Sequence, residues 1–410
     1  MRGICTIRAG NKKRGGKSVM KYDFQTVVSR KNTGAMKWEE SVTSTGFRPE
    51  VVPLSVADME FKACPEIVQG IKDAADTGVF GYTYNPPGFM DALVNWMKNR
   101  HDWEIKPEWV EQTWGVILAL YNCIKSYSEE GDKVIIQTPV YYPFFDAIRD
   151  TGRELVESPL KLVDGHYEMD YEDFAEKAKD AKMVLFCSPH NPVGRVWTRE
   201  ELERFAEICI ENDLIVVADE IHFDIIMPEY KHVAMGTVSE KLNERLVVCT
   251  SPSKTFNLAG LNLANIIIQN PEMMEKYKYT CLHSATDYNN FFGYAACTAG
   301  YAKGEAWLDQ MIATVESNYK VFKEFMNKNF PKVKVFDLEG TYLCWFDCKC
   351  FGLTGKELER KLVDEAWLFL DHGYVFGETG EGFERINLAC PESVLTDALE
   401  RFKKVFKELA

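Results

Sequence analysis

The sequence predicts an α/β protein: a three-layer α/β/α large domain with a mainly parallel sheet, plus a smaller α+β domain. Two observations predict this class. Continuous apolar runs of four or five residues, typical of strands buried on both faces, alternate with helical segments between residues 133 and 268. After about residue 304, short strands and amphipathic helices follow one another without that alternation. We therefore expect a large domain over residues 61–304 and a small C-terminal domain over residues 305–410.

The chain begins with a stretch unlike the rest. Residues 1–19 contain six lysines and arginines, no carboxylate and frequent glycine. We expect a flexible tail there, with Met20 opening the folded protein, in preference to a transit peptide. Residues 20–60 contain few periodic segments except an extended run at 51–59. We assign them to the small domain as its N-terminal segment.

Three helices are predicted before the first strand of the large sheet. Pro65 opens one that runs to about residue 77, a second covers residues 89–100, and a third follows the glycine turn at Gly115. Backbone N–H groups exposed at a helix start bind phosphate readily. The turn at Gly115 is therefore a candidate phosphate site.

An aromatic loop, residues 80–88, separates the first two helices and is punctuated by proline and glycine. Two interpretations of Tyr82 in this loop stay open. The ring packs within a turn, or the hydroxyl is offered to a phosphate in the same subunit or in a neighbouring one.

Five candidate strands follow, at residues 133–137, 183–187, 214–218, 246–249 and 264–268. The clearest helix between them covers residues 198–211, because Thr198 and Glu201 have the spacing of a capping box. Continuous apolar strands separated by helices favour a mainly parallel sheet that is covered on both faces.

Polar or aromatic side chains follow four of these strands where each strand ends. They are, in chain order, Tyr141, Asn191, Asp219 with His222, and Ser251 with Lys254. Because the carboxyl ends of parallel strands meet at one edge of a sheet, we expect these side chains to converge on one site.

The remainder of the chain predicts the small domain. Its expected elements are a helix at 307–329, strands at 333–336 and 341–346, a helix at 356–369, a glycine-rich loop at 373–382, a strand at 385–388 and a final helix at 391–409. Arg385 opens the last of these strands.

Composition excludes several kinds of partner. The net charge of -14 argues against a general nucleic-acid partner or an anionic membrane surface, since both require a basic face. No apolar run reaches the length of a membrane span, and there is no GxGxxG motif or P-loop. Twelve cysteines without framework spacing indicate reduced, mostly buried thiols and a cytoplasmic location.

Cys344, Cys348 and Cys350 are the one group of cysteines whose spacing resembles a metal site. Their even spacing would place all three on one strand face, and no nearby CxxC or histidine completes a tetrahedral set. We therefore expect buried thiols and no metal.

Four residues meet the needs of one cofactor, pyridoxal 5′-phosphate (PLP), and of its amino-acid substrate. PLP requires a carboxylate to keep its ring nitrogen protonated, a donor to its phenolic oxygen and a lysine that bonds to its aldehyde. The substrate requires a guanidinium for its carboxylate. The sequence supplies these groups in Asp219, Asn191, Lys254 and Arg385. Lys254 alone would be an ordinary loop lysine, but the combination favours a PLP site.

The motifs Ser-Pro-His-Asn191-Pro-Val-Gly, Ala-Asp219-Glu-Ile-His222, Ser251-Pro-Ser-Lys254 and Glu-Arg385-Ile-Asn occur in this order. With them the chain resembles the fold-type-I PLP-dependent enzymes of the class I/II aminotransferase superfamily from about Met20 to its end. It is most similar to the cystathionine β-lyase-like C–S lyase branch, which the run Val56-Ala57-Asp58-Met59 and the histidine at His222 also indicate.

The resemblance implies further roles at the site. Tyr141 is expected to stack on the PLP ring, Val116 and Ile117 to offer backbone N–H groups to the phosphate, and Ser251 to add a hydroxyl. Tyr82 is expected to reach the phosphate and substrate of a partner subunit, which implies a homodimer. His222 is expected either to hydrogen-bond near the phenolic oxygen of PLP or to be a packed core histidine. A phosphate-binding arginine of classical aspartate aminotransferases is replaced here by Asn262.

The resemblance implies β-elimination of L-cystathionine or related cysteine S-conjugates to a thiol, pyruvate and ammonia. Two alternatives stay open: an aminotransferase for a neutral or aromatic amino acid, and a PLP-binding regulatory protein with incidental lyase activity. The same residues would serve an aminotransferase, so the site motifs do not separate the first two.

Overall fold

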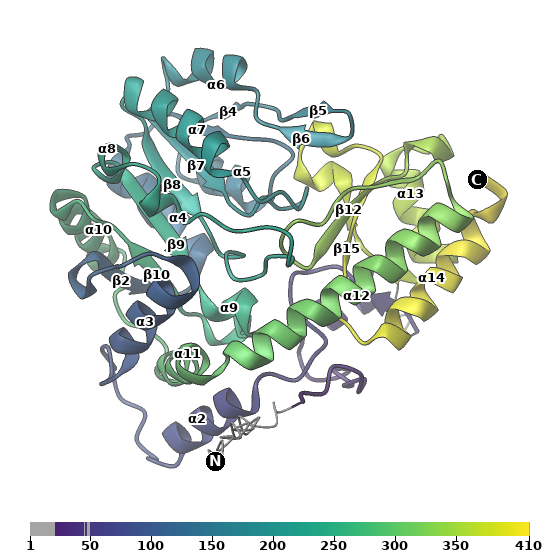
Figure 1. Ribbon diagram of the computed structural model, residues 1–410, viewed down its shortest axis with the longest axis horizontal. Coiled ribbons are helices and arrows are strands. Elements are labelled where there is room, and N and C mark those ends of the chain that lie inside the picture. Colours follow the sequence, from purple (N-terminus) through teal and green to yellow (C-terminus); the bar gives the residue numbers. More distant parts are fainter. Residues whose placement is uncertain (1–20, 45, 47–49, 410) are drawn as a thin grey trace, which may run out of the picture.

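The computed structural model of the chain describes residues 21–44, 46 and 50–409. The tail expected at residues 1–19 lies outside the described residues. A seven-stranded sheet in the order β2-β10-β9-β8-β7-β3-β4 forms the centre of the larger part of the molecule (Figure 1). Its strands are β2 Val110–Thr113, β3 Lys133–Ile136, β4 Glu154–Glu157, β7 Met183–Cys187, β8 Ile215–Asp219, β9 Leu246–Thr250 and β10 Ala264–Ile267.

The five neighbouring strands from β4 to β9 are parallel, whereas β10 is antiparallel to both of its neighbours. The five predicted strands are present within one residue of their expected ends. The prediction of a mainly parallel sheet is therefore confirmed.

Side chains of the sheet alternate between two hydrophobic cores. On β3, Val134 and Ile136 belong to a core shared with α4, α5 and α10, whereas Ile135 belongs to the core on the other face. On that other face the ring of Phe186 in β7 stacks on Phe205 of α7, with ring centroids 4.3 Å apart. Helices thus cover both faces, because a parallel sheet is apolar on both.

The helices are α1 Met36–Ser44, α2 Pro65–Ala75, α3 Phe89–His101, α4 Val116–Tyr127, α5 Pro143–Asp150, α6 Tyr171–Ala178, α7 Arg199–Glu211, α8 Glu240–Asn243, α9 Pro252–Thr255, α10 Pro271–His283, α11 Phe291–Lys303, α12 Glu305–Asn329, α13 Gly355–Arg360 and α14 Glu392–Phe406. The capping box predicted for α7 is present: Thr198 accepts from the backbone of Glu201, and the Glu201 side chain accepts from that of Thr198. Within the described ranges, none of the helices combines the length and apolar character needed to cross a membrane.

A second sheet, with the antiparallel order β11-β12-β15-β14, lies alongside the long helix α12 (Figure 1). Its strands are β11 Lys334–Val335, β12 Leu343–Asp347, β14 Asp371–His372 and β15 Phe383–Asn387. Two small pairings stand apart from the sheets, namely β5 Lys161–Val163 with β6 His166–Glu168, and β1 Val52–Pro53 with β13 Leu368–Phe369. The pairing of β1 with β13 favours one small domain made of residues 20–60 and 305–410, and this division stays a prediction.

The helix predicted at 356–369 is wrong in its second half. Helix α13 passes into a π-helical turn at Lys361–Glu365, and the chain then turns at Trp367, whose φ of 55° is in the left-handed region. Leu368 and Phe369 follow as strand β13. The apolar spacing of this segment suits a helix, but the parallel pairing with the distant β1 decides its structure.

The prediction that Cys344, Cys348 and Cys350 share one strand face is also wrong. Strand β12 contains Cys344 but ends at Asp347, so Cys348 and Cys350 lie in the turn beyond it. The eleven cysteines of the described ranges are free thiols, and all except Cys350 are buried. No group of histidine, cysteine and carboxylate side chains among the described residues is arranged to hold a metal.

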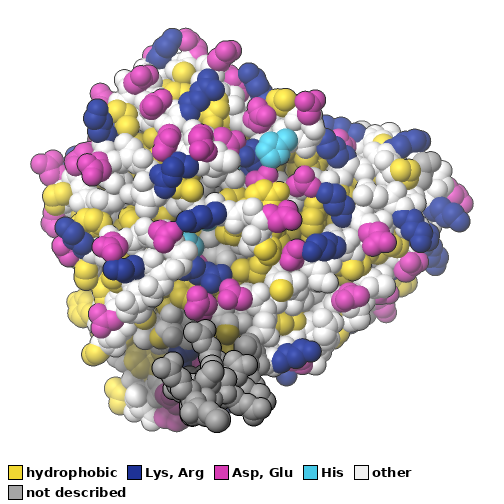
Figure 2. All heavy atoms as spheres, in the orientation of Figure 1, with side chains coloured by type: hydrophobic (Ala, Val, Ile, Leu, Met, Phe, Trp, Pro, Cys, Tyr) yellow, Lys and Arg dark blue, Asp and Glu magenta, His cyan; other side chains and the backbone are white. Residues whose placement is uncertain are grey.

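The surface in view carries acidic and basic side chains intermixed (Figure 2). Lysines and arginines do not gather into one broad basic area on this face, and such an area is what nucleic-acid binding requires.

Candidate active site

The carboxyl ends of β3, β7, β8 and β9 border a pocket of about 200 Å³. Seven residues predicted from the sequence line it: Val116, Ile117, Tyr141, Asn191, Asp219, His222 and Lys254. The other lining residues are Ala57, Trp114, Gly115, Cys187, Ile221, Ser253, Ala259 and Asn262. The strand ends therefore converge as the parallel sheet requires.

Lys254 lies in the short helix α9 that follows β9. Its Nζ donates a hydrogen bond of 2.6 Å to the carbonyl oxygen of Ala57, which also accepts from the Tyr342 hydroxyl at 2.8 Å. Burial lowers the pKa of Lys254 to about 8, although the carboxylate of Asp58 acts in the opposite direction. The structure thus holds a lysine amine that is close to losing its proton near neutral pH.

The segment that contains Ala57 is held on both sides. Asn387, at the end of β15, donates to the carbonyl oxygens of Val56 at 2.8 Å and of Asp58 at 2.7 Å. Asn257, in the loop after Lys254, donates to the carbonyl oxygen of Met59 at 3.0 Å. Three segments far apart in sequence are therefore joined at the lysine.

Asp219 is the last residue of β8, and its carboxylate accepts the backbone N–H of Ile221 at 3.0 Å. Burial raises the pKa of Asp219 to about 7, despite this hydrogen bond and the nearby positive charge of Lys254. A buried carboxyl group with a raised pKa requires a cationic partner to stay ionised.

Arg385 is buried and lies one hydrogen bond away from the pocket. Its guanidinium donates to Oδ1 of Asn191 at 2.7 Å, pairs with Asp371 and lies 4.8 Å above the ring of Phe376. These contacts fix the plane of the guanidinium. The structure thus brings Asn191 and Arg385 together, as the sequence predicts for one site.

The turn at Gly115 and the side chain of Tyr141 form further parts of the pocket. Gly115, with φ of 91°, precedes α4 and allows the turn that exposes the first N–H groups of the helix, at Val116 and Ile117. Tyr141 also lines the pocket, and burial raises the pKa of its hydroxyl.

Ser251 is outside the pocket lining. Its Oγ lies 2.7 Å from the carbonyl oxygen of Leu263 and accepts the backbone N–H of Ser253 at 3.0 Å, so it caps α9. The serine that lines the pocket is Ser253. The role predicted for Ser251 stays a prediction, and the two serines of the motif could not be separated without the fold.

Tyr82 lies apart from the pocket lining of its own chain and is 89% exposed. Its ring packs against Tyr288, with ring centroids 5.0 Å apart. His222 lines the pocket, and its Nδ1 is buried without a hydrogen-bond partner among the described residues. Burial lowers the pKa of His222 well below its usual value, so the ring is neutral.

Ala57 and Tyr342 were not predicted as site residues. The branch motif at residues 56–59 is a signal near Ala57, but the contact is made by a backbone carbonyl, which side-chain patterns do not report. Tyr342 directly precedes β12, and its hydroxyl donates to the same carbonyl oxygen of Ala57.

Comparison with known proteins decides the family. A family model described as aminotransferase class I and II matches residues 49–402. The chain belongs to this family.

Similar proteins include cystathionine beta-lyase PatB of Bacillus subtilis strain 168, 36% identical over 93% of this chain and 99% of PatB. Among solved structures, PLP-containing cystalysin of Treponema denticola is 42% identical, with a TM-score of 0.93 over 95% of this chain and all of cystalysin. A PLP-bound putative aminotransferase of Clostridium difficile 630 is 39% identical, with a TM-score of 0.92 over 94% of this chain and all of that one. The predicted fold and superfamily are confirmed.

Proposed function

We propose that the protein is a PLP-dependent carbon–sulfur lyase that splits L-cystathionine or a related cysteine S-conjugate into a thiol, pyruvate and ammonia. The observation that supports this most is one pocket that combines a partly buried lysine, Lys254, with a buried carboxyl group, Asp219. The similarity to PatB and cystalysin supports the lyase over other reactions of this family.

The residues of the pocket fit PLP. A protonated ring nitrogen is the cationic partner that the carboxyl group of Asp219 requires, and the amide of Asn191 suits the phenolic oxygen. The N–H groups at the start of α4 suit the phosphate. The unpartnered Nδ1 of His222 adds a buried polar atom that a bound group can satisfy.

In this proposal, bound PLP supplies an electron sink for the charge that develops when the substrate loses its α-proton. Lys254 removes that proton, because a pKa near 8 leaves part of its amine neutral at physiological pH. Arg385, held by Asn191 and Asp371, binds the substrate carboxylate. The carbon–sulfur bond then breaks, and sulfur leaves with the bonding electrons and takes up a proton. Water converts the remaining fragment to pyruvate and ammonia.

An assay without any keto acid tests this proposal. We expect the PLP-loaded protein to release thiol, pyruvate and ammonia in equal amounts from L-cystathionine or S-methyl-L-cysteine. Turnover only when 2-oxoglutarate or pyruvate is added would instead support an aminotransferase. No turnover in either assay would favour the regulatory alternative.

We also propose a homodimer in which Tyr82 completes the site of the partner. Four of the large apolar side chains around Tyr82 are strongly exposed: Val79 74%, Phe80 60%, Tyr84 76% and Trp114 53%. Trp114 both lines the pocket and donates a hydrogen bond to the carbonyl of Tyr288. An exposed aromatic area that begins at the pocket mouth suits a second subunit.

Mixing two impaired variants tests whether Tyr82 completes the site of the partner subunit. We expect Lys254→Ala and Tyr82→Ala homodimers each to lose at least about tenfold in kcat/KM. After co-refolding in equal amounts, about a quarter of wild-type activity should return, because half of the dimers are mixed and each has one intact site. Recovery does not occur if Tyr82 serves its own subunit. The control is a mixture of the two homodimers that have not been dissociated, so that no mixed dimers form.

The free, mostly buried thiols of the described residues suit a reducing compartment, and we propose the cytoplasm.

A further inference from the structure

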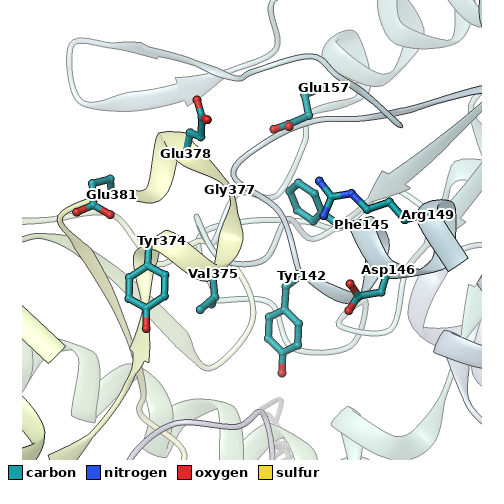
Figure 3. A pocket seen from close by; sticks show the side chains of 10 residues that line it. All are labelled: Tyr142, Phe145, Asp146, Arg149, Glu157, Tyr374, Val375, Gly377, Glu378 and Glu381. Atoms are coloured by element: carbon teal, nitrogen blue, oxygen red, sulfur yellow. The ribbon is translucent and has the colours of Figure 1, made fainter. Parts of the chain in front are cut away.

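A second cavity, of about 630 Å³, lies between helix α5 and the turn that follows β14 (Figure 3). One wall carries Tyr142, Phe145, Asp146 and Arg149 of the α5 region with Glu157 of β4, and the other carries Tyr374, Val375, Gly377, Glu378 and Glu381. The side chain of Arg149 extends over the ring of Phe145 toward the opposite wall, and Glu157 and Glu378 lie at the same end of the view, one on each wall.

The cavity is lined by charges of both signs that the protein does not pair. Arg149 lies 5.5 Å from the ring centroid of Phe145. Among the described residues, no ion-pair partner lies within 4.0 Å of Arg149 or of the carboxylates of Asp146, Glu157 and Glu378. Glu381, by contrast, accepts the backbone N–H of Gly355 at 2.5 Å. One guanidinium and the three carboxylates of Asp146, Glu157 and Glu378 thus line this cavity without an ion-pair partner among the described residues.

This cavity adjoins the lysine pocket through two pairs of neighbouring residues. Tyr142 lines the cavity and Tyr141 lines the pocket, with ring centroids 5.1 Å apart. On the other wall, Gly377 lines the cavity directly after Phe376, whose ring supports the guanidinium of Arg385. Neighbouring residues therefore line the cavity and the pocket assigned to the reacting end of the substrate.

We propose that this cavity binds the distal end of a substrate whose leaving group is itself an amino acid, as in L-cystathionine. Its α-carboxylate pairs with Arg149, and its α-ammonium lies between Glu157 and Glu378. This inference rests on the proposed lyase function and assigns its substrate class. Substrates with a neutral leaving group, such as S-methyl-L-cysteine, do not use these charges, because their leaving group ends at a methyl carbon.

The test compares the two substrates in the PLP-loaded protein. We expect Arg149→Ala and Glu378→Gln each to reduce kcat/KM for L-cystathionine about tenfold, mainly through KM, since a charged contact at a partly exposed site is lost. The value for S-methyl-L-cysteine should stay within about twofold of wild type. Arg204→Ala, which removes an exposed arginine of α7 stacked on Tyr171, is the matched control.

A binding measurement separates affinity from turnover. In the Lys254→Ala background, calorimetry should show about tenfold weaker binding of L-cystathionine when Arg149→Ala is added, and unchanged binding of S-methyl-L-cysteine. Equal losses for both substrates, or no loss for either, would overturn the cavity assignment while leaving the lyase intact. An inactive wild-type protein would instead overturn the proposed function on which this inference rests.

Discussion

Replacing Lys254 with alanine is expected to abolish lyase turnover, with a loss of about 10⁴-fold or more in kcat. This side chain is assigned both the covalent attachment of PLP and the removal of the α-proton. Lys254 is the lysine that lines the pocket and points to the Ala57 carbonyl. Steady-state release of pyruvate measures the effect.

The absorbance band of lysine-bound PLP should disappear in the same variant. Lys125→Ala, which removes an exposed lysine of α4, is the control and should keep both the band and the activity. A Lys254→Ala protein with wild-type turnover would refute the assignment.

Replacing Asp219 with asparagine should reduce kcat/KM by about 10²- to 10³-fold, since the group that stabilises a cationic ring nitrogen is lost. The same change should stabilise the apoprotein at pH 8. Burial raises the pKa of Asp219 from 3.8 to about 7, so keeping the carboxyl ionised in the fold costs about 4 kcal/mol above pH 7. Asparagine keeps an oxygen acceptor for the N–H of Ile221 without this cost.

The effect of Asp219 on the stability of the apoprotein depends on pH. Between about pH 4 and pH 7 the folded protein binds a proton at Asp219 that the unfolded chain does not, so stability falls as the pH rises through this window. The thermal midpoint of apo Asp219→Asn should therefore exceed that of the apo wild type by more at pH 8 than at pH 5. An apo variant that is less stable at pH 8, or equally shifted at both pH values, would contradict the account.

The sequence predicted the site residues that the parallel sheet brings together. Asn191, Asp219 and Lys254 lie at or just after the ends of consecutive parallel strands, and the geometry of such a sheet brings strand ends together without further information. Continuous apolar strands and the capping box of α7 were equally visible, because each is a local pattern with a physical cause.

The contacts that complete the site could not be predicted in this way. The carbonyl oxygen of Ala57 accepts a hydrogen bond from Lys254, which is 197 positions away in the sequence. Asn387 and Asn257 hold the segment that contains Ala57. The charges of the second cavity also come from two segments more than two hundred residues apart. The helix expected over residues 356–369 failed for the same reason, because the pairing of β13 with β1 overrides a local apolar pattern.

The central claim is that Lys254 is the residue to which PLP attaches. It is tested most directly by loading the wild-type protein with PLP, reducing it with borohydride and mapping the modified peptide by mass spectrometry. The account predicts one reduced phosphopyridoxyl group per chain, on Lys254. Modification of a different lysine, with Lys254 unmodified, would contradict it.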